Sequence, residues 1–175
     1  KTIALFLWAE YQKTRNRLDE FAVLPWVGDT LRYEQFLAST YAFGARGQVI
    51  YSKSAKRPPS DDEFTTFVEL CDQQTTYKSL ADNCRPVSKD SLLPGDLYIT
   101  FNEEGVKGKV VFLLTAIENE NGNRLFLIGE GCDSECDFHI PLMNSDKNFP
   151  WISVDQLMTM YPPGERAGYH RPRIK

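Results

Sequence analysis

Residues 93–142 constrain the fold more than any other part of the chain, because they contain several short apolar segments separated by turn residues. Leu93-Pro94-Gly95-Asp96 is typical of a turn, since proline presets φ and glycine supplies a positive φ. Residues 118–123 contain an Asn-Gly pair, which favours a hairpin between its neighbours. We therefore expect an antiparallel meander with strands over 97–101, 109–117, 124–128 and 138–142.

The second of these strands is apolar on both faces. Val110, Phe112 and Leu114 alternate along it with Val111 and Leu113. A strand that is buried on both sides needs a second layer. The sequence thus predicts N-terminal helices packed on a small antiparallel sheet, or a small, partly open barrel.

Size and charge narrow the class of protein. The chain has 175 residues, 42% hydrophobic and 25% charged, with a net charge of −4, which suits one globular α+β domain. Its Lys and Arg residues are scattered, so nucleic acid is not an expected partner. No apolar run approaches the roughly 20 residues of a membrane-spanning helix. Residues 3–9 favour a buried helix start over the end of a signal peptide, because no small-residue cleavage site follows them.

Four cysteines leave three interpretations open: one or two disulfides, free buried thiols, or a metal site. They are Cys71, Cys84, Cys132 and Cys136. Their spacing, with only two histidines, does not make a zinc ligand set, so metal is the weakest of the three. A disulfide would imply an oxidising compartment. The chain has no phosphate loop, dinucleotide-binding motif or metal-binding His pair, and we expect no cofactor.

The first 92 residues are expected to be mainly helical. Apolar spacing predicts helices over 2–19 and 31–43, with short extended segments at 21–26 and 48–51. Ile3, Leu7 and Tyr11 are expected to share the buried face of the first helix, and Ala4, Leu5 and Trp8 widen that face. Ser60, followed three residues later by Glu63, forms a capping box ahead of a helix over 61–73, and residues 76–83 add a further turn or two.

The last segment, 143–175, is expected to contain a loop, a short capped helix from Ser153, and an extended strap over the surface from Tyr161 onward. No internal repeat or long linker divides the chain. We therefore expect one domain, with a helical part over 1–92, the meander over 93–142 and the C-terminal part over 143–175.

Two pairs of residues are candidates for chemistry. Lys109 opens the second strand and Glu130 follows the third, so we expect them to meet at one end of the hairpin as a salt bridge rather than a catalytic pair. Cys132 and His139 are close enough in sequence to meet across a turn. A catalytic thiol normally lies at a helix N-terminus, which Cys132 lacks, so packing or a disulfide is the simpler interpretation.

Several short motifs occur in an order that is similar to one family. They are Ala9-Glu10-Tyr11, Tyr33-x-x-Phe36-Leu37, Phe64-x-x-Phe67, Ser79-Leu80, Pro94-Gly95-Asp96, Gly108-Lys109-Val110-Val111, Phe126-Leu127-Ile128 and His139-Ile140. Over nearly the whole chain they resemble a bacterial domain-of-unknown-function family of secreted or lipid-anchored proteins. The resemblance implies a location in the bacterial cell envelope, either periplasmic or on the outer surface.

Members of that family look distantly similar to papain-like cell-wall hydrolases of the NlpC and CHAP kinds, which implies a papain-like architecture. The family pattern places a histidine at the start of the second strand and a glutamine at the end of the third. In this chain those positions hold Lys109 and Glu130, and the family's cysteine would fall ahead of Lys1. Because lysine does not exchange protons near neutral pH as imidazole does, the resemblance implies a site without hydrolase chemistry.

We therefore expect a non-catalytic envelope domain that binds a protein, or a cell-wall glycan or peptide, through its former cleft. Trp26, Trp151 and Tyr98 are candidate binding residues, although a core aromatic is the simpler interpretation of each. The alternative is a cysteine amidase or peptidase acting on cell-wall peptides, with Cys132 or a cysteine ahead of Lys1 as its nucleophile.

Overall fold

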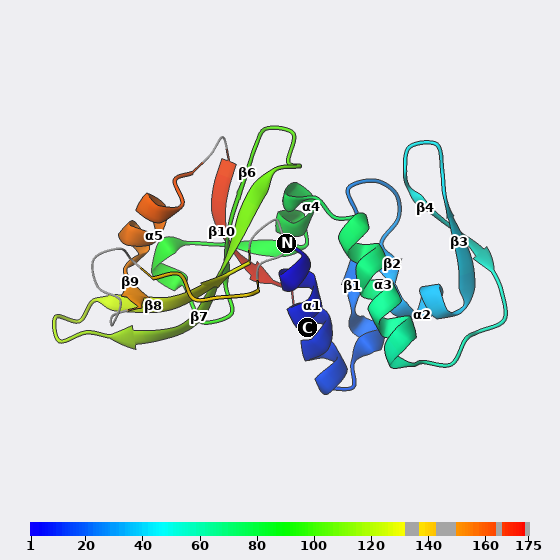
Figure 1. Cartoon of the computed structure of the whole chain (residues 1–175), viewed down its shortest axis with the longest axis horizontal. Helices are drawn as coiled ribbons and strands as arrows, with labels where there is room; N and C mark the ends of the chain where they lie inside the picture. The colour runs from blue at the N-terminus through cyan, green and yellow to red at the C-terminus, as the bar shows by residue number, and fades with distance from the viewer. Residues whose placement is uncertain (132–136, 143–149, 164–165, 174–175) are drawn as a thin grey trace. The chain divides into compact units, whose positions relative to one another are not determined.

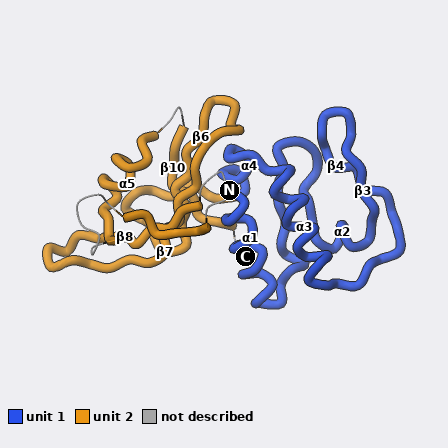
Figure 2. The backbone as a smooth tube through the Cα atoms, in the orientation of Figure 1, with its two compact units in different colours: residues 1–83, 175 blue, residues 84–174 orange. Residues whose placement is uncertain are grey.

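The computed structural model describes residues 1–131, 137–142, 150–163 and 166–173. They form two compact units, residues 1–83 and the residues from 84 onward, which Figure 2 colours blue and orange. Both units combine helices with antiparallel strands, as labelled in Figure 1, and this confirms the α+β class.

The first unit contains four helices and two small sheets. Its elements are α1 (Thr2–Thr14), a 3-10 turn (Leu18–Glu20), β1 (Ala22–Val23), β2 (Leu31–Arg32), α2 (Tyr33–Leu37), β3 (Ser39–Phe43), β4 (Val49–Lys53), α3 (Asp61–Gln73) and α4 (Tyr77–Asp82). The predicted cap of α3 is present, because the Ser60 hydroxyl accepts a hydrogen bond from the Glu63 backbone N–H at 3.1 Å.

The core of the first unit is built from aromatic rings. Phe21 contacts Trp8 of α1 edge-on at 5.6 Å between ring centroids, and contacts Phe67 of α3 at 6.0 Å. The predicted buried face of α1 is confirmed for Ala4, Leu5 and Trp8. It is wrong for Leu7 and Tyr11, which are 48% and 41% exposed. Apolar residues surround most of this helix, so the face that carries the large Trp8 ring takes the interior position. That face consists of Ala4, Leu5, Trp8, Ala9 and Gln12.

The helix predicted over 31–43 is also wrong in extent. Helix α2 ends at Leu37, and Ser39–Phe43 form strand β3, which pairs with β4 in antiparallel register. The expected helical spacing of Tyr33, Phe36 and Leu37 is present, but residues 39–43 find a cross-strand partner in residues 49–53 instead. Gly47, at φ +81°, allows the tight turn between the two strands.

The second unit is a six-stranded antiparallel sheet in the order β5-β10-β6-β7-β8-β9. Its elements are β5 (Cys84–Val87), a 3-10 turn (Lys89–Ser91), β6 (Leu97–Phe101), β7 (Gly108–Glu118), β8 (Arg124–Glu130), β9 (Trp151–Ile152), α5 (Val154–Met160) and β10 (Arg166–Pro172). The meander β6-β7-β8 is confirmed. Residues 138–142 contribute only a bridge between His139 and Glu130, and β9 is the strand that continues the sheet.

The predicted surface strap is a strand of the sheet. Strand β10 lies between β5 and β6 and pairs with both. Its Tyr169 ring packs against Tyr98 with 5.0 Å between centroids. A proline-rich composition argues against a strand, so the sequence did not indicate one here. The prolines nevertheless lie outside the interior of β10, because Pro162 and Pro163 precede it and Pro172 is its last residue.

The two faces of this sheet are covered differently. Helix α5 places Leu157 against one face, where it joins Tyr98, Val111, Phe126, Ile128 and Ile152 in a single apolar cluster. On the other face, the Phe138 ring contacts Phe112 edge-on at 5.4 Å and lies over Gly129. The interior of the sheet is therefore buried on both sides, as the apolar pattern of β7 predicted.

Candidate functional site

Lys109 and Glu130 lie on the face of the sheet that α5 covers. Glu130 pairs with Val111 in the β7–β8 ladder, and alternation along β7 puts Lys109 on the same face as Val111. The Lys109 Nζ atom is 2.6 Å from Glu130 Oε2. The predicted ion pair is therefore present, with a buried carboxylate and an ammonium on a side chain that is 40% exposed.

Tyr161, just beyond the end of α5, is a third member of this site. Its ring centroid is 5.0 Å from Lys109 Nζ. Burial raises the pKa of the Tyr161 phenol, and its hydrogen bond with Glu130 and the charge of that carboxylate raise it further. The Tyr98 hydroxyl donates to the Tyr161 backbone carbonyl at 3.1 Å and so fixes the chain there.

His139 completes the group through both its backbone and its ring. Its backbone N–H and carbonyl exchange hydrogen bonds with those of Glu130, each at 2.9 Å. The Nε2 atom lies 3.5 Å from Glu130 Oε1, and Nδ1 lies 3.1 Å from the Asp137 carbonyl oxygen. We refer to Lys109, Glu130, His139 and Tyr161 as the Glu130 cluster.

The sequence indicated three members of this cluster but not Tyr161. Tyr161 lies 31 positions after Glu130 in a Pro-rich segment, where it has no periodic pattern that links it to the strands. Its position follows from α5, whose capping box between Ser153 and Gln156 fixes the start of a seven-residue helix that ends beside β7 and β8. These capping residues are the feature of the sequence from which the position of Tyr161 could have been inferred.

The contacts of the Glu130 cluster converge on one carboxylate. An ammonium, a phenol and an imidazole all lie against it. Together these groups form a polar network at the border of the α5-covered core.

The two described thiols are not in a form suited to nucleophilic attack. Cys71 in α3 and Cys84 at the start of β5 are free and buried. Burial raises the pKa of the Cys71 thiol well above its usual range and raises the pKa of Cys84 to about 12. These two cysteines thus follow the free-thiol interpretation, whereas Cys132 and Cys136 lie outside the described residues.

The three aromatic residues proposed for binding differ in their surroundings. Tyr98 is 2% exposed and belongs to the core of the second unit, so its ring is not available to a ligand. Trp151 in β9 is half-buried. Trp26 belongs to the first unit, is 53% exposed and touches the turn at Gly47.

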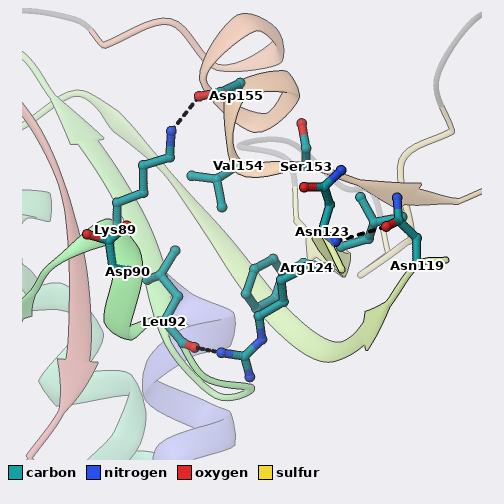
Figure 3. A pocket seen from close by; sticks show the side chains of 11 residues that line it. Lys89, Asp90, Leu92, Asn119, Asn123, Arg124, Ser153, Val154 and Asp155 are labelled. Atoms are coloured by element: carbon teal, nitrogen blue, oxygen red, sulfur yellow. Dashed lines mark hydrogen bonds and ion pairs between the residues drawn. The ribbon is translucent and has the colours of Figure 1, made fainter. Parts of the chain in front are cut away.

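A separate pocket of about 570 Å³ lies in the second unit between the β7–β8 turn, the start of α5 and the 3-10 turn before β6. Lys89 Nζ lies 2.6 Å from Asp155 Oδ1, and Arg124 donates to the Leu92 carbonyl at 2.6 Å. Figure 3 marks both interactions with dashed lines. Asn119 and Asn123 add amide groups to its wall. The pocket lining therefore includes cationic, anionic and neutral hydrogen-bonding side chains. The sequence did not indicate this pocket.

The described residues contain neither a metal site nor a membrane-spanning helix. Within the described ranges, no group of three or more His, Cys, Asp and Glu side chains is placed to hold a metal ion. None of the described helices has both the length and the apolar character needed to cross a bilayer.

Comparison with known proteins adds the family. Neither the curated proteins nor the solved structures gave a match to this chain. A family model, in contrast, matches residues 3–166, which include all four members of the Glu130 cluster and the pocket. This chain therefore belongs to the family described as Domain of unknown function (4846).

Proposed function

We propose that this chain is a non-catalytic, papain-like domain of the bacterial cell envelope that binds a cell-wall glycan or peptide, or a protein partner. The observation that carries the proposal is the 2.6 Å ion pair between Lys109 and Glu130. In the resemblance to cell-wall hydrolases, these two positions belong to a histidine and a glutamine that work with a nucleophilic cysteine. In this chain one of the two positions carries a positive charge and the other a negative charge. This pattern favours a former active site whose polar groups now stabilise the fold.

The pocket beside α5 is the proposed binding site of this domain. Sugars and peptides are recognised by a few well-placed polar groups beside apolar surface. Lys89, Asp155 and the two asparagines provide donors and acceptors, while Leu92 and Val154 provide apolar contact. Because these groups lie apart from the Glu130 cluster, binding there needs no catalytic residue.

A sedimentation assay with purified cell-wall sacculi tests this function. We expect the chain to sediment with the sacculi and to release no soluble sugar or peptide fragments during prolonged incubation. Lys89→Ala should weaken the binding, whereas Lys107→Ala, which removes an exposed lysine outside the pocket, should not. Release of fragments by the wild-type chain would contradict the non-catalytic proposal, and equal binding by both variants would contradict the pocket.

A cysteine amidase or peptidase is the alternative function, and one contact favours it. His139 Nε2 lies 3.5 Å from Glu130 Oε1, a carboxylate-imidazole contact of the kind that orients a catalytic histidine, and Cys132 follows Glu130 by two residues in the sequence. Mass spectrometry after treatment with a substoichiometric iodoacetamide probe distinguishes the two functions. Selective labelling of Cys132 at neutral pH would favour the enzyme, and absence of a hyper-reactive cysteine would favour the binding domain.

The proposed envelope location is tested separately. Fractionation of cells that produce the natural full-length protein should recover it with periplasmic or membrane-associated envelope proteins. Recovery with the cytoplasmic fraction would contradict this part of the proposal without affecting the binding assay.

A further inference from the structure

Arg124 differs from the other cation of the pocket beside α5, because its charge has no partner. Arg124 opens strand β8, and its side chain is one of the eleven that line the pocket. Lys89, the other cation of the lining, is paired with Asp155 at 2.6 Å. Within the described residues no carboxylate forms an ion pair with Arg124. The pocket therefore holds one cation that is available to an anionic group of a ligand.

Two contacts fix the position of the Arg124 guanidinium. It donates to the Leu92 backbone carbonyl at 2.6 Å, and its Cζ atom lies 5.3 Å from the centroid of the Phe126 ring. Figure 3 shows the guanidinium beside the Leu92 carbonyl, on the side of the pocket opposite Asp155. Most of its N–H donors remain available after the bond to Leu92. A cation that is held in place before binding loses less freedom when a ligand arrives.

The charges of the lining limit how much negative charge a ligand can carry. The lining contains two cationic side chains, Lys89 and Arg124, and two acidic ones, Asp90 and Asp155. Asp90, like Arg124, forms no ion pair with another described residue. A phosphate group, with nearly two negative charges near neutral pH, would be repelled by these carboxylates. A single carboxylate is the better match, and a planar guanidinium binds it through two parallel hydrogen bonds.

The neutral groups of the lining match a peptide. The Asn123 side-chain amide offers both donors and an acceptor, and no hydrogen bond of this amide is found in the described part of the chain. A peptide group offers one N–H and one C=O in return. Asn119 differs, because its Oδ1 atom accepts from the backbone N–H groups of Asn121 and Asn123 within the turn. Val154 adds apolar surface for a small side chain.

The aromatic residue of the lining is not open to a sugar ring. Sugars commonly pack their C–H groups on the face of an exposed aromatic side chain. Phe126 is 2% exposed, and the Arg124 guanidinium lies over its ring. The lining thus favours a peptide with a free carboxylate over a neutral glycan.

We propose that this pocket binds a peptide by its free C-terminal carboxylate, which the Arg124 guanidinium holds. The Asn123 amide pairs with the adjacent peptide group, and Val154 contacts the side chain next to it. This inference rests on the proposed function, because it uses the same pocket, and it selects the peptide among the ligands proposed there.

NMR titration of the isotope-labelled full chain tests the ligand class. The probe is N-acetyl-Ala-Ala, which carries one carboxylate and no ammonium. We expect it to bind and to shift the signals of the Asn123 side-chain amide and of the pocket lining. Its C-terminal amide has nearly the same shape without the charge and should bind about tenfold more weakly. Equal affinity for the acid and the amide, or shifts confined to residues outside the pocket, would overturn the proposal.

Substitutions of Arg124 locate the bound carboxylate. Arg124→Gln should lower the affinity for the acid about tenfold and leave the affinity for the amide unchanged, which general damage to the pocket would not do. Arg124→Lys keeps the charge without the planar fork, so its affinity for the acid should lie between those of wild type and Arg124→Gln. The matched control Arg166→Gln removes an exposed arginine outside the pocket and should bind as wild type does. Undiminished affinity for the acid in both Arg124 variants would overturn the assignment.

Two further probes distinguish other ligands of the same pocket. Inorganic phosphate that displaces the acid with similar affinity would identify a general anion site. N-acetylglucosamine that binds the pocket more tightly than the acid would identify a glycan site. Either result would overturn the proposal of a peptide carboxylate.

Comparison with the sacculus assay distinguishes this inference from the proposed function. Binding of the chain to sacculi without binding of N-acetyl-Ala-Ala would overturn the carboxylate inference and leave the proposed function in place. Binding of N-acetyl-Ala-Ala that depends on Arg124, without binding to sacculi, would support the inference and contradict the cell-wall function.

Discussion

Lys109 Nζ lies 2.6 Å from Glu130 Oε2, although the ladder pairs Glu130 with Val111, two residues further along β7. The two charged residues are therefore diagonal neighbours, and the long lysine side chain spans the offset. Glu130 is 8% exposed, whereas the Lys109 side chain is 40% exposed. Because one partner is buried and the other partly solvated, removing one is not equivalent to removing the other.

The first prediction concerns this asymmetry. Lys109→Met leaves a buried carboxylate without its cation and is expected to lower the free energy of unfolding by about 2 kcal/mol, with Tyr161 and His139 limiting the loss. Glu130→Gln leaves the ammonium able to turn toward water and should cost about 1 kcal/mol. Urea denaturation followed by circular dichroism measures both. The control Lys107→Met changes an exposed lysine and should stay within about 0.5 kcal/mol of wild type.

A double variant strengthens this test. Lys109→Met combined with Glu130→Gln removes both charges, so it should be more stable than the sum of the single losses predicts. Simple additivity of the two losses would show that the ion pair has no coupling energy, and the retired-site interpretation would then lose its physical basis.

The second prediction concerns Asp96 and Arg171, which join the turn before β6 to the C-terminal strand. The Arg171 guanidinium donates to both oxygens of Asp96 at 2.6 and 2.7 Å, and Asp96 is 1% exposed. Asp96 Oδ2 also accepts from the Leu93 backbone N–H at 2.8 Å. Asp96→Ala should therefore cost about 3 kcal/mol, measured by thermal unfolding, and should speed hydrogen exchange in β10 before other strands.

Asp155 provides the matched control for that variant. It also forms an ion pair, with Lys89 at 2.6 Å, but its side chain is 76% exposed. Asp155→Ala should cost less than about 1 kcal/mol, because water screens and replaces the interaction. Equal destabilisation by the two Ala substitutions would contradict the assignment of Asp96 as the residue that anchors β10.

The sequence predicted elements whose signals are local. Ser60 and Glu63 define the start of α3, the Pro94-Gly95 turn precedes β6, and the Asn121-Gly122 turn separates β7 from β8. These features depend on residues a few positions apart, which a single sequence displays. The ion pair of Lys109 with Glu130 was predictable for the same reason, since one hairpin sets both positions.

The sequence did not predict elements that depend on distant partners. Residues 39–43 become a strand because residues 49–53 pair with them, and β10 is a strand because β5 and β6 lie on either side of it. Tyr161 joins the Glu130 cluster because of where α5 ends. None of these partners leaves a periodic pattern in the segment itself, so local composition indicated a helix or a strap instead.

The third prediction concerns the thiols. In a variant with Cys132→Ser and Cys136→Ser, only the buried Cys71 and Cys84 remain. Since burial raises the pKa of both, with Cys84 at about 12, we expect almost no reaction with Ellman's reagent at pH 8 under native conditions. Two thiols per chain should react after addition of guanidinium chloride. Rapid native labelling of either cysteine would contradict its buried position.

The fourth prediction concerns Tyr169 and stability at alkaline pH. Burial raises the pKa of the Tyr169 phenol to about 12, with smaller contributions from Tyr98 and Asp155, against about 10 in the unfolded chain. Between these values the folded state holds a proton that the unfolded state has released. This contribution is therefore complete below pH 10 and is lost as pH rises toward 12.

Tyr169→Phe isolates that contribution, because phenylalanine has no proton to lose. Within the described residues the Tyr169 hydroxyl is buried without a hydrogen-bond partner, so its removal should change the melting temperature little at pH 7. Between pH 10 and 12, the melting temperature of Tyr169→Phe should fall less steeply than that of the wild type. The control Tyr11→Phe removes an exposed phenol and should follow the wild-type curve. Identical pH dependence for Tyr169→Phe and wild type would show that this phenol ionises as readily in the folded state as in the unfolded chain.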